Sequence, residues 1–303
     1  MHYKDDLVSV IIPTYGRCEY LQRTVFSVLK QTYSNIEVIV VDDNGKSSLQ
    51  GLETQKVMHT FIGNSKVKYL QHDINKNGSA ARNTGLAASK GEYVAYLDDD
   101  DEFTPEKIQT QLAQLKTDTE YAASYCLNSK FYHGKRVQTT KYTKSGNCQF
   151  DVLCIKSDIH TSSLLMRKQS VIDMEGFDEA YARHQDYEFL IRFFEHNKIK
   201  CLPIDLLRIH VESEINRPNV DKLIAAKIVY FHKLDRIISK YTTNEKKAIY
   251  KAHNLELFRV CVKKLDKRLF KYIILAKPSF VDIKQYIYPV AVRYIRKLFP
   301  HRR

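Results

Sequence analysis

One short segment constrains the fold of this chain more than any other. Residues 93–101 read Tyr-Val-Ala-Tyr-Leu-Asp-Asp-Asp-Asp, so an apolar run ends directly in four adjacent carboxylates. The apolar run predicts a buried strand. Neighbouring anions repel one another, and oxygen ligands suit Mg²⁺ or Mn²⁺. Ligands of open α/β sheets also bind beyond the carboxyl ends of strands. The segment indicates either a divalent-cation site or a solvated turn before a helix that Thr104 caps and Pro105 begins.

Composition indicates a globular protein. A chain of 303 residues, 44% hydrophobic and 27% charged, can bury the core of one large domain with an appendage. The six cysteines form no Cys-x-x-Cys pair, which favours free thiols in a reducing compartment. The first residues contain no apolar signal core, and no apolar stretch approaches the ~20 residues that cross a bilayer. We therefore expect a cytoplasmic protein, with peripheral attachment to the inner face of the membrane left open.

Charge divides the chain into two regions. Residues 221–303 contain 21 Lys and Arg against 6 Asp and Glu, whereas the first 220 contain 27 against 29. The segment 216–219, Asn-Arg-Pro-Asn, reads as a linker between them. We expect one domain at residues 1–218, made of two halves at 1–101 and 102–218. A basic, amphipathic helical extension is expected at 219–303.

The first region alternates strands with helices. Apolar runs predict strands at residues 7–13, 36–41, 67–71 and 93–97, and apolar spacing predicts helices at 19–31 and 80–89. This order indicates a mostly parallel sheet covered by helices on both faces. The loops 13–17, 42–45 and 98–101 then meet at one edge. Neither Gly-x-Gly-x-x-Gly nor a Walker-type Gly-Lys-Ser/Thr follows the first strand, which counts against dinucleotide oxidoreductases and P-loop hydrolases.

Four segments carry a family resemblance. They are Val-Ser-Val-Ile-Ile-Pro-Thr-Tyr (8–15), residues 27–44 ending in Val-Val-Asp-Asp-Asn, Asn-Gly-Ser-Ala-Ala-Arg-Asn-Thr-Gly-Leu (77–86), and residues 91–101. Together they resemble the family-2 glycosyltransferases across residues 7–212. The resemblance implies the GT-A fold, a Rossmann-like α/β domain that binds nucleotide-diphospho-sugars. It makes residues 1–101 the nucleotide-sugar-binding half and residues 102–218 the acceptor-binding half. Gly16 departs from the Asn usual there, and Gln185 from a frequent Glu.

The resemblance assigns nucleotide-sugar contacts to the loops. Asp43 matches a carboxylate that accepts hydrogen bonds from uracil and ribose; its alternative role is a turn cap. Pro13, Thr14 and Tyr15 correspond to the wall against the base. Arg82 matches a position near the nucleotide, with a surface arginine as the alternative.

The carboxylate run corresponds to the Asp-x-Asp motif of the family. The resemblance makes Asp98 and Asp100 the ends of the motif and Asp100 the likeliest ligand of Mn²⁺ or Mg²⁺. Asp99 would reach the ribose or a metal-bound water, and Asp101 would be a bystander. His210 matches a histidine that faces the metal or diphosphate in some members, although a lone strand-end histidine usually makes ordinary hydrogen bonds.

The catalytic base is assigned to the second half of the domain. The segment 160–167 reads as a strand, and Arg183-His184-Gln185-Asp186-Tyr187-Glu188 opens a helix whose apolar face is buried. Asp186 matches the general base of the family; its alternative role is a carboxylate that stabilises the helix start. The nearby acids Asp178, Glu179 and Glu188 compete for the assignment.

The resemblance implies a single, inverting displacement from a UDP-sugar or related donor to a saccharide or lipid-linked saccharide, as in capsule or O-antigen synthesis.

The basic extension suits either an anionic membrane surface, with residues 290–299 as an amphipathic face, or packing on the domain with a solvated face. Basic charge also suits a nucleic-acid-binding protein, but the tail contains no recognised module and nucleic acid is not expected. A nucleotide-sugar-binding protein without transfer activity and a nucleotidyltransferase are the remaining alternatives.

Overall fold

The computed structural model describes residues 4–181, 184–211, 219–284 and 287. The chain divides into two compact units, one made of residues 1–152 with 157–214 and the other of residues 153–156 with 215–303. The expected domain boundary after residue 218 adjoins the segment 212–218, which lies outside the described residues.

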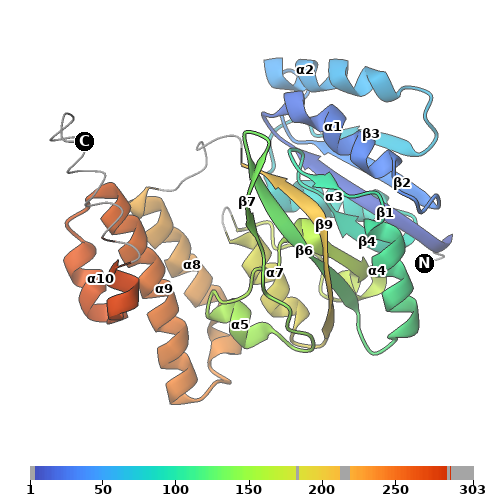
Figure 1. Cartoon of the computed structure of the whole chain (residues 1–303). Coiled ribbons are helices and arrows are strands. Elements are labelled where there is room, and N and C mark those ends of the chain that lie inside the picture. Colours follow the sequence, from blue (N-terminus) through green and yellow to red (C-terminus); the bar gives the residue numbers. More distant parts are fainter. Residues whose placement is uncertain (1–3, 182–183, 212–218, 285–286, 288–303) are drawn as a thin grey trace. The chain divides into compact units, whose positions relative to one another are not determined.

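Four parallel strands form the first half of the sheet in unit 1 (Figure 1). They lie in the order β3 (Val67–Gln71), β2 (Ile36–Asp42), β1 (Lys4–Thr14) and β4 (Gly91–Tyr96). The helices between them are α1 (Cys18–Leu29), α2 (Leu49–Met58) with the 3₁₀ turn η1 (His59–Phe61), and α3 (Gly78–Ala88). The predicted alternation of strands and helices is confirmed.

Alternation along β1 separates the two faces of this sheet. Val8, Val10 and Ile12 are fully buried in a cluster with apolar residues of α1, α2 and α4 (Lys107–Thr117). Ile11 faces α3 instead, where a Cβ on Gly85 would lie 2.3 Å from Ile11 Cγ2. The glycine therefore allows α3 to lie close against β1, and the tight packing leaves no room for a larger residue.

The second half of the sheet is mixed. It continues from β4 through β8 (Leu164–Arg167), β6 (Ala123–Tyr132), β9 (Ile199–His210) and β5 (Glu102–Phe103), and β7 (Lys135–Thr139) pairs with β6. Only β6 and β9 are parallel among these pairs. The short helices are α5 (Gln149–Leu153), α6 (Lys168–Asp173) and α7 (Gln185–Phe193), with the 3₁₀ turn η2 (Thr161–Ser163) before β8. Antiparallel pairing places β8 beside β4, next to the acidic segment.

Two predicted element starts are wrong. The helix expected to begin at Pro105 begins at Lys107, and the hydroxyl of Thr104 makes no hydrogen bond to its first turn. The strand expected over residues 160–167 begins at Leu164. Before it, the Ser163 hydroxyl donates to the carbonyl of His160 at 2.6 Å, and such bonds favour a turn over a strand.

Unit 2 is helical. It contains α8 (Val220–Ile238), α9 (Thr243–Lys264) and α10 (Leu269–Ala276), consistent with the predicted helical, basic extension. The Asn219 side chain caps α8, and Thr242 with Glu245 forms a capping box on α9. Val220, Leu257, Phe258 and Tyr272 contribute to an apolar core of its own. The predicted amphipathic segment 290–299 lies outside the described residues.

Two chain-wide expectations concern cysteines and membrane spans. All six cysteines are free thiols, as their spacing predicts. Among the described residues, none of the helices combines the length and apolarity needed to cross a membrane.

Candidate active site

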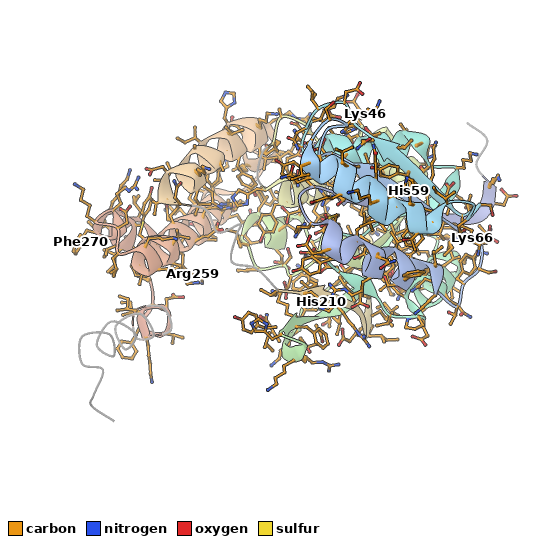
Figure 2. The ribbon with its side chains drawn as sticks, turned by 90° about the horizontal axis from the view of Figure 1, so that it is seen from above. Lys46, His59, Lys66, His210, Arg259 and Phe270 are labelled. Atoms are coloured by element: carbon orange, nitrogen blue, oxygen red, sulfur yellow. The ribbon has the colours of Figure 1, made fainter. Side chains whose placement is uncertain are left out.

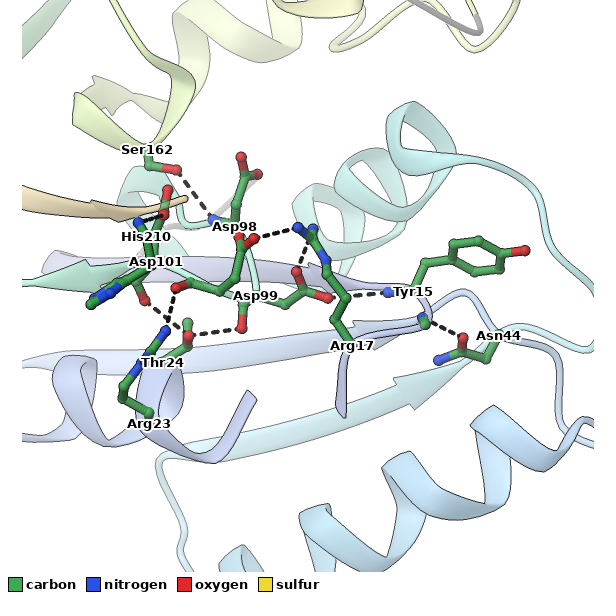
Figure 3. A network of polar contacts seen from close by, with 12 residues as sticks. Tyr15, Arg17, Arg23, Thr24, Asn44, Asp98, Asp99, Asp101, Ser162 and His210 are labelled. Atoms are coloured by element: carbon green, nitrogen blue, oxygen red, sulfur yellow. Dashed lines mark hydrogen bonds and ion pairs between the residues drawn. The ribbon is translucent and has the colours of Figure 1, made fainter. Parts of the chain in front are cut away.

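Three loops meet at the carboxyl edge of the parallel strands. β1, β2 and β4 are hydrogen-bonded neighbours, so the loops 13–17, 42–45 and 98–101 that follow them share one edge, as predicted (Figure 3). Backbone and side-chain bonds tie the loops together. The Asp43 N–H donates to the Thr14 carbonyl at 2.9 Å, and the Gly16 N–H donates to Asn44 Oδ1 at 2.7 Å.

The four carboxylates of the acidic segment differ in exposure. Asp99 and Asp101 are buried, with 1% and 2% of their surface exposed, whereas the side chains of Asp98 and Asp100 are 28% and 20% exposed. The Thr24 hydroxyl lies 2.9 Å from the carbonyls of both Asp99 and Asp101 and holds the backbone between them. Asp98 and Asp100 are therefore the acids of this segment that a ligand can reach.

Burial and mutual repulsion oppose ionisation in this cluster. Burial raises the pKa of Asp99 to about 7 against the lowering effect of Arg17, with Asp100 and Asp98 adding repulsion. Burial and the neighbouring carboxylates also raise the pKa of Asp100 and of Asp101. Asp98 is the exception: burial raises its pKa, but Arg82, His160 and Arg17 lower it more. Ionising the whole cluster is therefore unfavourable without a further positive charge.

Arginine side chains form ion pairs with the carboxylates of the acidic segment. Arg17 pairs with Asp99 at 2.6 Å and also with Asp100. Arg82 pairs with Asp98 at 2.7 Å. Arg23 donates to the Asp100 carbonyl at 2.7 Å. Arg82 therefore reaches the acidic motif, and its contact with the nucleotide stays a prediction; Arg17 was not anticipated.

A pocket of about 400 Å³ opens beside the cluster. The predicted residues that line it are Pro13, Thr14, Tyr15, Asp43, Arg82 and Asp98. Those that sequence reasoning missed include Arg17, Asn75, Asn77 and Gln185. Tyr15 is 61% exposed, so its ring presents an open aromatic surface, which suits the predicted contact with a base.

Asp43 anchors the loop that follows β3. Its Oδ1 accepts from the His72 ring at 2.7 Å and from the Lys76 N–H at 2.7 Å. Its Oδ2 accepts from the Asn75 side chain and the Asn77 N–H, both at 2.8 Å. A carboxylate has about four acceptor positions, so protein donors occupy them in this structure. The nucleotide contact expected of Asp43 remains a prediction, and its observed role is to shape the pocket wall.

Asp186 lies in the first turn of α7 and is half-buried. Its neighbour Gln185 lines the pocket and accepts from the Ser79 hydroxyl at 2.8 Å. Among the described residues, the Asp186 carboxylate makes no hydrogen bond or ion pair. Nothing in the structure yet places it against an acceptor, so its role as base remains a prediction.

The competing acids have structural partners. Glu188 is buried and paired with Arg192, whose guanidinium also holds the carbonyls of Met174 and Gly176. Asp178 accepts from the Ala180 N–H at 2.8 Å, and Glu179 accepts from the Asn83 side chain at 2.9 Å. These contacts favour Asp186 over the other three acids as the available base.

The two histidines near the cluster differ from expectation. The ring Nε2 of His210, the predicted metal ligand, lies 2.7 Å from Glu102 Oε1. The backbone N–H of His210 donates to Asp101 Oδ1 at 3.1 Å. His160, which carried no predicted role, has its Nε2 4.0 Å from Asp98. The Ser162 N–H donates to His160 Nδ1 at 3.3 Å, so a neutral ring carries its proton on Nε2. His160 is therefore a hydrogen-bond donor toward the cluster rather than a metal ligand.

The donor set at the cluster fits a hard divalent cation. Oxygen atoms of Asp98 and Asp101 and a nitrogen of His160 lie within 4.8 Å of one another. Because the His160 nitrogen facing Asp98 is a donor, the carboxylates are the ligands that fit, and oxygen ligands are those that Mg²⁺ and Mn²⁺ prefer. This group contains Asp98 and Asp101, whereas the predicted ligands are Asp98 and Asp100; Asp98 is common to both sets, and the assignment of Asp100 stays a prediction.

A larger cavity lies away from this edge. It has about 550 Å³ and lies among α2, η1 and β3, with Met58, Phe61 and Ile62 in its wall. None of the predicted site residues lines it, and it brings no carboxylate cluster into reach. The smaller pocket, with its convergent charged groups, is the better candidate for a chemical site.

Comparison with known proteins supplies independent information. Residues 9–174 match the family model described as Glycosyl transferase family 2. The putative colanic acid biosynthesis glycosyl transferase WcaA of Escherichia coli strain K12 is 36% identical over 42% of this chain and 45% of its own. The UDP-Glc:alpha-D-GlcNAc-diphosphoundecaprenol beta-1,3-glucosyltransferase WfgD of Escherichia coli is 32% identical over 65% of this chain and 74% of its own.

The matched share differs between the curated relatives and the solved structures. The chain spans between 30% and 64% of the length of five of its curated relatives. A solved structure of S. aureus TarS 1-349 in complex with UDP-GlcNAc matches 96% of this chain and 92% of its own, with a TM-score of 0.59 and 15% identity. At that identity the likeness concerns the fold.

Proposed function

Because this chain belongs to the family-2 glycosyltransferases and has their GT-A fold, we propose that it transfers a sugar from a nucleotide-diphospho-sugar to an acceptor hydroxyl. The observation that carries the proposal is the 400 Å³ pocket at the carboxyl edge of the parallel strands. Its walls bring together an open aromatic ring at Tyr15, the guanidinium groups of Arg17 and Arg82, and the carboxylate of Asp98. The pocket thus offers an aromatic surface to a nucleotide base, guanidinium groups to a diphosphate, and a carboxylate to a divalent cation.

The proposed reaction assigns a role to residues in and beside this pocket. Asp186 removes the proton from the acceptor hydroxyl as that oxygen attacks the anomeric carbon. Arg82 and the Nε2–H of His160 lie beside Asp98 and donate to the departing diphosphate. When bound by Asp98 and Asp100, Mn²⁺ or Mg²⁺ would neutralise negative charge on the leaving nucleoside diphosphate. One displacement inverts the anomeric configuration.

The proposed donor is a UDP-sugar. The name of WfgD specifies UDP-Glc, and TarS has been solved with UDP and with UDP-GlcNAc. A hexosyl or N-acetylhexosaminyl group is the corresponding sugar class. Tyr15 offers a flat surface to a base, and uracil is the base that both comparisons supply.

The proposed acceptor is a saccharide, free or lipid-linked, in bacterial surface polysaccharide synthesis such as capsule or O-antigen. The support is again from relatives, since WcaA is named for colanic acid and WfgD for a diphosphoundecaprenol-linked acceptor. A lipid-linked acceptor fits a protein whose second unit is basic.

A thermal-shift panel tests the donor proposal. UDP, GDP, CDP and dTDP are each added with Mn²⁺ and, separately, with EDTA. We expect stabilisation by UDP that requires Mn²⁺, because ligand binding raises apparent stability with occupancy. A shift for another nucleotide would keep the reaction and change the donor. Absence of any shift would argue against the transferase and favour the binding of nucleic acid or lipid by unit 2.

Unit 2 also presents a surface suited to an anionic bilayer. Phe270, Ile274 and Phe280 on or after α10 are 68%, 71% and 80% exposed, and Figure 2 shows Phe270 at the surface of this unit. The lysines 267, 271 and 277 belong to the same segment. Exposed apolar residues beside basic ones suit the interface of an anionic membrane, where each basic residue contributes about 1 kcal/mol.

Vesicle sedimentation tests this surface. We expect the protein to sediment with vesicles containing phosphatidylglycerol and not with neutral vesicles. Ile274→Ser should reduce the bound fraction severalfold, because it removes an inserting side chain. The matched control is Ile62→Ser in unit 1, which is 74% exposed and should bind like wild type. If the bound fraction falls equally in both variants, or the protein binds neither kind of vesicle, the membrane proposal is wrong. The basic helices would then pack with their charged face in solvent.

A further inference from the structure

Arg17 occupies the acidic cluster as a cation would. Its Nη2 lies 2.6 Å from Asp99 Oδ1, and its Nη1 contacts the carboxylate of Asp100 (Figure 3). Asp99 also accepts from the Tyr15 N–H at 3.2 Å. One guanidinium thus bridges a buried and an accessible carboxylate of the same motif.

Other arginines do not duplicate this contact. Arg82 pairs with Asp98 and donates to the Gly78 carbonyl, while Arg23 donates to the Asp100 carbonyl and lies 3.5 Å from Glu102. Arg17 is therefore the guanidinium that pairs with the side chains of Asp99 and Asp100 in the described structure. The positive guanidinium contacts Oδ2 of Asp100, and like charges repel, so its presence opposes a divalent cation at the same carboxylate.

The position of Arg17 allows it to leave. Its side chain is 36% exposed, and it lines the nucleotide-sized pocket. The preceding Gly16 has φ +70°, a conformation that favours glycine, and no heavy atom lies within 4 Å of where its Cβ would be. The Arg17 side chain therefore borders both solvent and the pocket, so the group it would pair with after release lies in the same pocket.

We propose that Arg17 is the resident counter-ion of the acidic cluster, and that it releases Asp100 when a divalent cation binds and then pairs with the donor diphosphate. The inference rests on the proposed function for the identity of the diphosphate. Its first half depends only on competition for the carboxylates. A planar guanidinium with paired donors matches phosphate oxygens, so the released group has a suitable partner in the same pocket.

Binding of Mn²⁺ alone, measured by the loss of its free EPR signal, tests the first half. We expect Arg17→Ala to bind Mn²⁺ about tenfold more tightly than wild type, because a charge-assisted competitor is gone. Arg17→Lys should fall between them, since it keeps the charge but bridges two carboxylates less well. The control is Lys46→Gln, which removes a charge from the ion pair with Asp73 beside α2 (Figure 2). Lys46→Gln should bind like wild type.

Calorimetric titration of UDP at saturating Mn²⁺ tests the second half. We expect Arg17→Ala to bind UDP about tenfold more weakly than wild type. Melting curves in EDTA and in Mn²⁺ establish that each variant is folded. Unchanged Mn²⁺ affinity in folded Arg17→Ala and Arg17→Lys would overturn the counter-ion, and unchanged UDP affinity would overturn the transfer to diphosphate. Failure of wild type itself to bind UDP would instead contradict the proposed function.

Discussion

Asp186→Asn is expected to lose transfer by about 10²- to 10⁴-fold while UDP binds as tightly as to wild type. The substitution keeps the shape of the side chain but removes its ability to take a proton. Asp186 lies at the start of α7 beside the pocket-lining Gln185, and among the described residues its carboxylate makes no hydrogen bond or ion pair. The measurement is the initial rate of UDP release from a UDP-sugar with acceptor present, beside the affinity for UDP.

Two neighbouring acids provide controls for Asp186. Glu179→Gln alters an exposed carboxylate that accepts from the Asn83 side chain, and it should retain activity. Glu188→Gln breaks a buried pair with Arg192 and should lower the melting temperature, because the guanidinium is left partly unpaired. Turnover unchanged in Asp186→Asn, or lost equally in Glu179→Gln, would remove Asp186 from the role of base.

Asp100→Ala is expected to abolish the dependence of UDP binding on Mn²⁺. Asp100 is one of the two accessible carboxylates of the cluster, and its partner Arg17 cannot itself hold a cation. Loss of residues that only support a metal ligand costs about 10- to 100-fold in affinity, so loss of a direct ligand should cost at least that much. The measurement is UDP affinity with Mn²⁺ and with EDTA, which should become equal in the variant.

The control for this prediction is another acid in the same unit. Asp118→Ala removes an exposed carboxylate 3.4 Å from Lys200, far along the chain from the motif, and should leave the Mn²⁺ effect intact. If Asp100→Ala keeps the full effect of Mn²⁺ on UDP affinity, Asp98 and Asp101 are sufficient to hold the cation. The role of Asp100 would then be to pair with Arg17.

Local pattern was sufficient to predict the first half of the fold. The strand predicted at 67–71 is β3 exactly as observed, and the apolar runs before Pro13, Asp42 and Asp98 each form a buried parallel strand. Such runs alternate with helices, so the meeting of their three loops follows from topology alone. The mixed second half depends on pairings between distant strands, and no local pattern in β6 or β9 specifies them.

The acids of the candidate site and Arg82 were predicted, whereas Arg17 and His160 were missed. Pro13, Thr14, Tyr15, Asp43, Arg82 and Asp98 all line one pocket. All of them except Arg82 lie at or beside strand ends that topology brings together, and Arg82 lies in α3. Arg17 was missed, although loop 13–17 was placed at this edge, because its partners lie 82 and 83 residues further along the chain. His160 depends on the turn η2, whose formation in place of a strand was not anticipated.

Two assignments show where residue type alone is insufficient. His210 has the chemistry of a metal ligand, yet its ring nitrogen lies against Glu102. Asp43 has the chemistry of a nucleotide acceptor, yet four protein donors surround its carboxylate. In both cases the partners come from other elements, and side-chain hydrogen bonding is decided by tertiary position.

Titration of UDP into the wild-type protein, first with Mn²⁺ and then with EDTA, tests the central claim most directly. The arrangement of Asp98 and Asp100 beside the pocket predicts binding with Mn²⁺ and loss of most of that affinity when the cation is removed. Equal affinity in both conditions would contradict a cation-dependent donor site. Absence of binding in either condition would contradict UDP as the nucleotide of this site.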